Sequence, residues 1–308
     1  MLKIDRAVQY MLLSTLSLSA TGLLAKLLSN QLPIPWFSFL RFSMPALILL
    51  IVLSFTNIKL PSKQEFKPLL TRALCIGLCQ LCFLKSLQTL SLVESVVLFA
   101  TGPLFMPILE RLFFKVRINV WNIAALIVTF VGVILLAGHS GEMKWRFDIL
   151  LGIAGGIFNA GSQLALYRSS KSTLSPKEIN FWCFACAAVF VLPIALFCSS
   201  EFHFVSLISS NQGLYQLLFL IMMALLVINT QVNRAKAYKL AHSGSQLAPL
   251  IFTNLVFSTI WQFVFFQQTF THQQIFGLSL IVVATMTNSL LPNWLKKQKV
   301  KKLHKKVA

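Results

Sequence analysis

Charged residues are scarce in this sequence: they make up 11% of its 308 residues, and only eight of them are Asp or Glu. A soluble domain of this length carries charge on about a quarter of its residues, so the composition argues against a water-soluble globule. The apolar residues make up 56% of the chain and come in long blocks. The solvent around this protein is therefore predicted to be lipid.

Two further features are missing. The sequence has no glycine-rich phosphate-binding loop, which argues against ATP-driven transport by this chain alone, and we predict no cofactor. None of the apolar runs carries an Asp, Glu or His near its middle, where a proton pump usually needs one. Exchange or facilitated movement of a solute is therefore at least as well supported as proton-coupled transport.

Ten apolar segments are long enough to cross a bilayer, since about 20 residues span its hydrocarbon core. Backbone groups in lipid must be hydrogen-bonded within their own segment, so these runs predict an all-α membrane protein. The first run exceeds the roughly 7–15 apolar residues of a signal peptide and is interpreted as a span. The predicted spans are 7–29, 34–56, 68–90, 92–114, 118–138, 149–170, 178–200, 213–238, 243–267 and 271–292.

Basic residues fall mainly on one side of these spans. With a cytoplasmic N-terminus, 22 of the 27 Lys and Arg residues lie in cytoplasmic segments, whereas only Lys144 and Arg146 lie on the opposite side. Basic segments stay in the cytoplasm during insertion, which predicts a multi-pass inner-membrane protein with both termini cytoplasmic. The net charge of +19 then does not indicate a nucleic-acid partner. The basic tail 296–308 is interpreted as an anchor to anionic lipids.

The chain also divides into two similar halves, 1–141 and 142–295. Residues keep their identity at offsets near 140 to 150; for example, Ala20 matches Ala160 and Leu24 matches Leu164. Five spans per half is an odd number, so the second half must be inserted upside down. Inverted repeats of this kind are typical of secondary transporters, whose substrate site lies near mid-membrane between the halves.

Several short motifs add to this pattern. They include Phe39-Leu40-Arg41-Phe42 in the second span, Gly102-Pro103 in the fourth, Gly132-Val133-Ile134-Leu135 in the fifth, and Ala248-Pro249 in the ninth. With these motifs the chain resembles the ten-helix EamA-type branch of the drug/metabolite transporter superfamily, from about residue 10 to residue 291. The resemblance implies a transporter of small metabolites and does not identify the metabolite. One difference is that Lys115-Val116 and Gln267-Gln268 replace the Gly-Glu pair that the family commonly carries.

Cations within spans are candidates for substrate binding, because a buried charge costs about 2.5–3.5 kcal/mol on insertion scales. Lys26, Arg41 and Lys85 are the three candidates, and all belong to the first half, so the cavity is predicted to take its positive charge from that half. Lys26 could instead reach the headgroups, and Lys85 could pair with Glu94. Arg41 lies deeper, and its planar guanidinium suits a carboxylate or a phosphate.

Neutral polar residues within spans complete the predicted substrate site: Asn159, Gln163, Asn180 and Gln246. Pro103 and Pro249 lie in equivalent helices of the two halves, where each acts either as a static kink or as a hinge. The six cysteines fall inside apolar stretches and are interpreted as packed thiols, not as disulfides or metal ligands.

These observations predict a secondary transporter, working as an exchanger or facilitator by alternating access. Its substrate is expected to be a small polar metabolite with a carboxylate or phosphate, held by Arg41 together with Lys26 or Lys85. The alternative is a membrane-embedded enzyme that acts on a lipid-linked substrate, and a non-transporting scaffold comes third. The sequence shows no surface cluster of His, Asp and Glu that such an enzyme would need.

Overall fold

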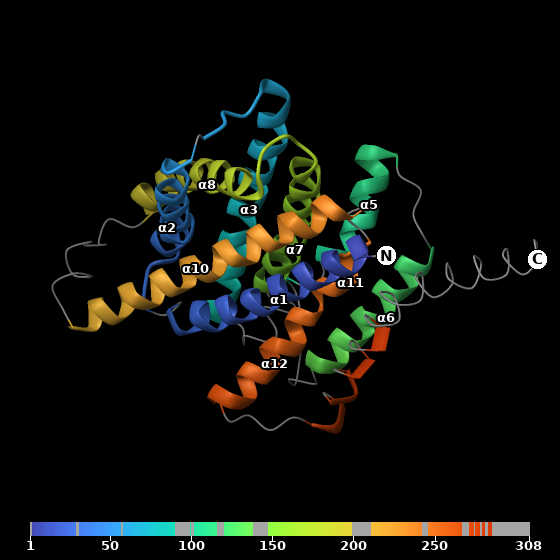
Figure 1. The fold of residues 1–308 in the computed structure, drawn as a ribbon. Coiled ribbons are helices and arrows are strands. Elements are labelled where there is room, and N and C mark those ends of the chain that lie inside the picture. The colour runs from blue at the N-terminus through green and yellow to red at the C-terminus, as the bar shows by residue number, and fades with distance from the viewer. Residues whose placement is uncertain are drawn as a thin grey trace, which may run out of the picture.

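The computed structural model describes residues 2–28, 31–56, 58–89, 99, 102–115, 120–137, 147–198, 211–241, 246–266 and short pieces of 271–284. The regular elements in this part of the chain are all helices, which confirms the all-α prediction there (Figure 1). They are α1 (Leu2–Leu28), α2 (Ile34–Ser54), α3 (Lys63–Thr89), α5 (Gly102–Phe114), α6 (Val120–Ala137), α7 (Phe147–Ser170), α8 (Pro176–Cys198), α10 (Asn211–Leu240), α11 (Ala248–Ile251) and α12 (Thr253–Phe266).

Six of these helices, α1, α2, α3, α7, α8 and α10, are long and apolar enough to cross a membrane. They coincide with six of the ten predicted spans. The helices α5, α6 and α12 lie within three further predicted spans, and most of the tenth, 271–292, lies outside the described residues. The structure therefore supports a multi-pass membrane protein, and the count of ten spans remains a prediction.

The two predicted hinge prolines occupy different places in their helices. Pro103 lies in the first turn of α5, where a residue without an N–H group is tolerated. Pro249 lies in the four-residue helix α11, and the chain leaves the helical path at Phe252 before α12 begins. The Thr253 hydroxyl donates to the Leu250 carbonyl oxygen at 2.8 Å across this interruption. Whether either proline acts as a hinge remains a prediction.

Helices from the two ends of the chain pack against each other. The main pairs are α1 with α10, α2 with α8, and α3 with α7, and Figure 1 shows α1 and α10 running side by side. Two further pairs bring α5 onto α7 and α12 onto α1. Side chains from distant parts of the sequence therefore meet in the middle of the bundle.

Two short sequence motifs begin α3 and α8 in the same way. Each is a Ser followed three residues later by a Glu, the pattern of a capping box. The Glu65 amide donates to the Ser62 hydroxyl at 3.4 Å, and the Ser62 amide donates to the Glu65 carboxylate at 3.0 Å. The Glu178 amide likewise donates to the Ser175 hydroxyl at 3.3 Å, and the Ser175 amide donates to the Glu178 carboxylate at 2.7 Å. Both helices thus begin with satisfied backbone donors.

The same two carboxylates connect the loop before α3 to the loop before α8. Glu65 accepts a hydrogen bond from the Thr173 amide at 3.1 Å, and Glu178 accepts one from the Lys59 amide at 3.0 Å. The Trp182 indole donates to the Lys59 carbonyl oxygen at 3.1 Å. We call this pair of cross-connections, centred on Glu65 and Glu178, the loop brace.

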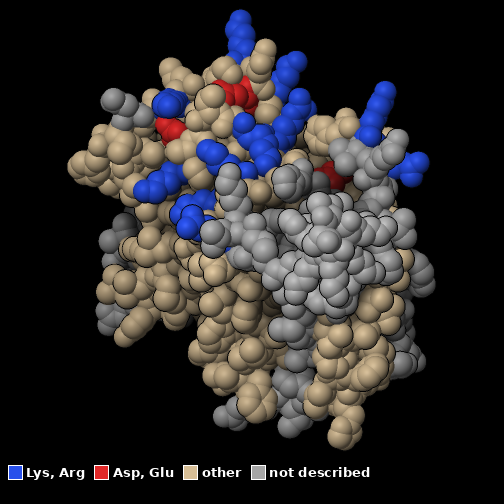
Figure 2. Space-filling model, turned by 45° about the vertical axis from the view of Figure 1, so that its right-hand side comes forward, with Lys and Arg blue, Asp and Glu red and all other residues tan. Residues whose placement is uncertain are grey.

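Exposed charge is concentrated at one end of the molecule. In the view of Figure 2, Lys and Arg side chains gather at the upper end with the visible acidic groups, and the described surface below is uncharged. Large apolar side chains cover the middle of the helices; Ile51, Val189 and Leu225, for example, are all exposed. An apolar belt below a charged end is the surface expected of a protein embedded in a bilayer.

Candidate functional site

A small enclosed cavity of about 80 Å³ lies between α1, α2, α3, α7, α8, α10 and α12. This volume is room for roughly two or three water molecules. Its polar lining comes from both ends of the chain: Thr21, Arg41, Cys79, Gln80, Asn159, Gln163, Thr230, Gln231, Arg234, Asn254 and Ser258. No Asp or Glu occurs among the described lining residues. The cavity is therefore small and positively charged, with its polar groups set among apolar side chains such as Phe42 and Phe184.

Arg41, a predicted substrate-binding residue, enters the cavity from α2. It is 9% exposed, and its guanidinium lies 6.0 Å from the centre of the Phe37 ring, at the outer limit of a cation–π contact. Its Nη1 atom is buried and has no hydrogen-bond partner among the described residues. A buried guanidinium with an unused donor is costly unless an acceptor or an anion reaches it.

A second arginine, Arg234, enters the cavity from α10 and is also buried. Its Nε atom donates to the Ser14 hydroxyl at 3.1 Å, which fixes the plane of the guanidinium. The Nη2 atom is buried and lacks a partner in the described part of the chain. The cavity thus takes one cation from each half of the chain, and the prediction that only the first half supplies positive charge is wrong.

Arg72 is a third buried arginine, on α3, and it supports the site without lining the cavity. Its Nη2 atom donates to the Asn180 amide oxygen at 2.8 Å and to the Gln231 amide oxygen at 3.1 Å. Asn180 in turn donates to the Pro176 carbonyl oxygen at 2.7 Å. Asn180, predicted to bind substrate, therefore joins α3 to α8, while Gln231 connects Arg72 to the cavity wall.

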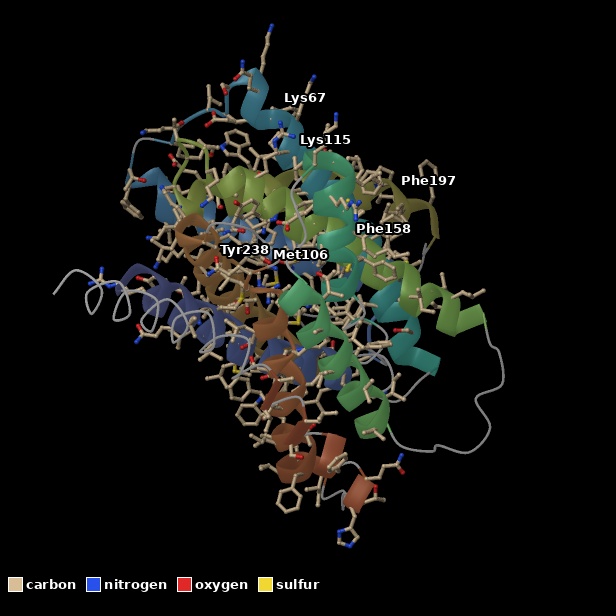
Figure 3. The ribbon with its side chains drawn as sticks, turned by 90° about the vertical axis from the view of Figure 1, so that its right-hand side faces the viewer. Lys67, Met106, Lys115, Phe158, Phe197 and Tyr238 are labelled. Carbon is tan, nitrogen blue, oxygen red and sulfur yellow. The ribbon has the colours of Figure 1, made fainter. Side chains whose placement is uncertain are left out.

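Asn159 and Gln163 line the cavity from α7, one helical turn apart. The Gln163 amide donates to the Asn159 oxygen at 3.2 Å, and the Tyr238 hydroxyl donates to the Gln163 oxygen at 3.3 Å. Tyr238 is fully buried beside Met106, in the middle of the bundle (Figure 3). This chain of hydrogen bonds orients the two predicted amides, and the structure brings both of them to the cavity with Arg41.

Five buried polar groups in the cavity wall have no hydrogen-bond partner among the described residues. They are Arg41 Nη1, Gln80 Nε2, Thr230 Oγ1, Arg234 Nη2 and Asn254 Oδ1. Three of the five can only donate, and the threonine hydroxyl can donate as well. Because buried polar groups are nearly always satisfied, this wall is suited to a ligand rich in acceptors.

The other predicted site residues lie outside the described cavity lining. Lys85 is exposed on α3, Lys26 is half-buried on α1, and Gln246 is half-buried just before α11. The structure therefore does not bring either lysine to Arg41. In the described part of the chain, the cation that lines the cavity together with Arg41 is Arg234, which the charge pattern places on the cytoplasmic side.

Comparison with known proteins gives a consistent result. A sequence model of the EamA-like transporter family matches residues 5–138 and 146–290. Uncharacterized transporters of two Helicobacter pylori strains are 28% identical over 114 residues, or 36% of this chain and 38% of theirs, so the match spans well under half of these relatives. A protein crystal structure superimposes with a TM-score of 0.70, covering 96% of this chain and 97% of that one at 16% identity, which shows a shared fold.

Proposed function

Because the chain belongs to the EamA-like transporter family, we propose that it is a secondary transporter of a small organic anion. The substrate carries a carboxylate or a phosphate and crosses the cytoplasmic membrane by exchange or facilitated movement. The coarser statement, a multi-pass membrane transporter, follows from the family and from the apolar helices. The family favours transport over the alternative of an enzyme acting on lipid-linked substrate.

The observation that carries the proposal is the pair of arginines in the cavity. Arg41 and Arg234 each present a buried donor that no described protein group accepts. A carboxylate or phosphate has several acceptor oxygens, so it can accept from both donors. A carboxylate offsets one of the two positive charges, and a phosphate, with a charge of about −1.5 to −2, offsets most of both. Gln80 and Thr230 supply neutral donors beside them, which suits further oxygen atoms of the same solute.

Alternating access is supported by the symmetry of the helix packing. In the repeat, α1, α2, α3 and α5 of the first half would correspond in order to α7, α8, α10 and α12 of the second. When each helix is replaced by its counterpart, the α1–α10 contact becomes the α7–α3 contact, which is also present. The same exchange maps α2–α8 onto itself and α5–α7 onto α12–α1. Such pairing is expected of two inverted repeats, which we place at residues 1–141 and 142–295.

The size of the cavity also supports a moving structure. Pockets that hold small organic ligands usually measure about 300–1,000 Å³, several times the 80 Å³ enclosed here. A metabolite of that size needs a wider cavity, which movement of the surrounding helices would provide. We place the charged end of the molecule on the cytoplasmic side, by the positive-inside rule.

Transport into sealed proteoliposomes tests the proposal. The purified protein would be reconstituted with a panel of labelled anionic, zwitterionic and cationic metabolites, with and without unlabelled solute inside. We expect uptake of an anionic class, with acceleration by internal solute if the protein is an exchanger. Arg41→Gln and Arg234→Gln should each reduce uptake by about ten- to a hundredfold, since a hydrogen bond to a charged group contributes about 1.5–3 kcal/mol.

Lys85→Gln is the matched control, because this substitution removes an exposed cation of α3 outside the cavity. It should leave uptake near the unsubstituted level. Uptake of cations alone, or equal loss in all three variants, contradicts the anion site. Modification of a lipid-linked substrate without solute movement would favour the enzyme instead.

A further inference from the structure

A second and larger hollow lies on the outside of the bundle, between α3, α5 and α7, and encloses about 620 Å³. We call it the lateral groove. It shares no described lining residue with the cavity. Its walls are formed by Gln64, Lys67, Pro68, Thr71, Cys75, Leu109, Phe113, Phe114, Ile157, Phe158, Gly161, Leu164, Ala165 and Arg168.

The lateral groove is polar at one end and apolar along the rest of its length. Its α7 wall runs from Ile157 to Arg168, a distance of roughly 16 Å at 1.5 Å per residue. Arg168 ends this wall, and its guanidinium lies 5.5 Å from the centre of the Phe114 ring. Lys67 stands at the corresponding end of α3. Figure 3 shows Lys67 near the end of the molecule and Phe158 further toward its middle.

Lys67, at the charged end of the groove, lies at the upper end of the molecule in Figure 3, where Lys and Arg side chains gather in Figure 2. In a bilayer this end lies at the level of the phospholipid headgroups, and the apolar part of the groove lies at the level of the acyl chains. Ile157 and Phe113 remain 42% and 67% exposed. The groove therefore opens toward lipid. Its charged end matches the headgroup of a phospholipid, and its apolar part matches the acyl chains.

We infer that the lateral groove binds an anionic phospholipid of the adjacent leaflet. The headgroup phosphate lies between Lys67 and Arg168, and one acyl chain follows the apolar wall past Leu164 and Phe158. The planar guanidinium of Arg168 pairs with phosphate oxygens through two N–H groups. No Asp or Glu is among the described residues of the groove to oppose the headgroup. Two cations at one phosphate favour a headgroup with net negative charge over a zwitterionic one.

Native mass spectrometry of the detergent-solubilised full chain tests this inference, with titration by phosphatidylglycerol and separately by phosphatidylcholine. Each cation near an anionic headgroup contributes about fivefold to binding, so Lys67→Gln with Arg168→Gln should weaken phosphatidylglycerol binding by about 25-fold. The charge-matched control is Lys63→Gln with Lys177→Gln, which removes two exposed cations outside the groove. This control should bind phosphatidylglycerol as the unsubstituted protein does.

A second pair of variants tests the apolar part without touching charge. Ile157→Trp places an indole in the groove and should displace the lipid, whereas Val189→Trp adds the same group at an exposed position of α8 outside the groove. Equal phosphatidylglycerol binding by the charge variant and its control overturns the inference, and so does equal binding of phosphatidylcholine. Competition by glycerol phosphate at the same concentration would identify a free-phosphate site and also overturn it. A dimer that Ile157→Trp dissociates, with no lipid effect, would assign the groove to a second copy of the chain.

Discussion

The loop brace offers a matched pair of substitutions, because Glu65 and Glu178 make the same kinds of hydrogen bond in different surroundings. Glu178 is 5% exposed and accepts from the Lys59 and Ser175 amides at 3.0 and 2.7 Å. The hydrogen bonds of Glu65 lie at the exposed surface. We predict that Glu178→Ala destabilises the protein far more than Glu65→Ala.

The magnitude follows from what each substitution leaves behind. A hydrogen bond to a charged acceptor contributes about 1.5–3 kcal/mol, and a buried donor left without a partner costs about 1–3 kcal/mol. Glu178→Ala leaves two backbone donors that water reaches poorly, so we expect a loss of about 3 kcal/mol in the free energy of unfolding. At Glu65 water replaces the carboxylate and the Ser62 hydroxyl still caps the helix, so we expect a loss of about 1 kcal/mol or less.

Equilibrium unfolding in mixed micelles of dodecyl sulfate and a mild detergent measures both values under reversible conditions. Tryptophan fluorescence is a suitable signal, because Trp182 donates to the Lys59 carbonyl oxygen within the same brace. Glu178→Gln keeps one acceptor oxygen in its side-chain amide. Its free energy of unfolding should therefore lie between those of the unsubstituted protein and Glu178→Ala. Equal losses for the two alanine variants, or a larger loss at Glu65, would refute the argument from burial.

Three further substitutions test the packing between helices and the capping of one helix end. Gly102→Ala places a methyl group 2.9 Å from the Gly156 carbonyl oxygen and 3.0 Å from the Asn159 amide nitrogen. We expect this crowding to lower the free energy of unfolding by about 1–3 kcal/mol in the same micelle assay. Substrate binding should weaken as well. Gly22→Ala meets nothing within 4 Å, so the free energy of unfolding should stay constant or rise by up to about 1 kcal/mol; a loss like that of Gly102→Ala would contradict this. Lys171→Met removes an ammonium that donates to two carbonyl oxygens at the end of α10, at 3.0 and 2.6 Å. Hydrogen exchange there should accelerate by roughly five- to thirtyfold, for a loss of about 1–2 kcal/mol, and unchanged exchange would exclude this capping role.

The positions of the long helices could be predicted from the sequence because bilayer thickness sets them. An apolar run of about 20 residues has few alternatives in lipid, and the runs at 34–56 and 178–200 accordingly became α2 and α8. The interruption at Phe252 was harder to predict. A proline removes one backbone hydrogen bond, but whether the helix then bends or ends depends on neighbours such as Thr253, which bonds back to the preceding turn.

The buried arginines show where the sequence argument reached its limit. Arg41 was identified because it lies well inside its span. Arg72 and Arg234 lie inside the predicted spans 68–90 and 213–238 but close to their cytoplasmic ends, so the charge pattern places them among the cytoplasmic residues. Both are at most 2% exposed in the structure. The depth of a residue along a span can be predicted from the sequence. Which face of the helix is buried depends on partners from other helices, such as Asn180 for Arg72 and Ser14 for Arg234.

Arg72 also constrains the order in which the protein assembles in the membrane. Its two acceptors, Asn180 and Gln231, follow it by 108 and 159 residues in the chain. A ribosome adding about 5–20 residues per second needs roughly 5–30 seconds to deliver them. Throughout that interval the Arg72 guanidinium lacks these partners, and carrying it to the centre of the bilayer would cost about 2.5–3.5 kcal/mol. We therefore expect the Arg72 end of nascent α3 to stay at the level of the cytoplasmic headgroups until α8 and α10 emerge, so that packing of the first half is completed only by the second.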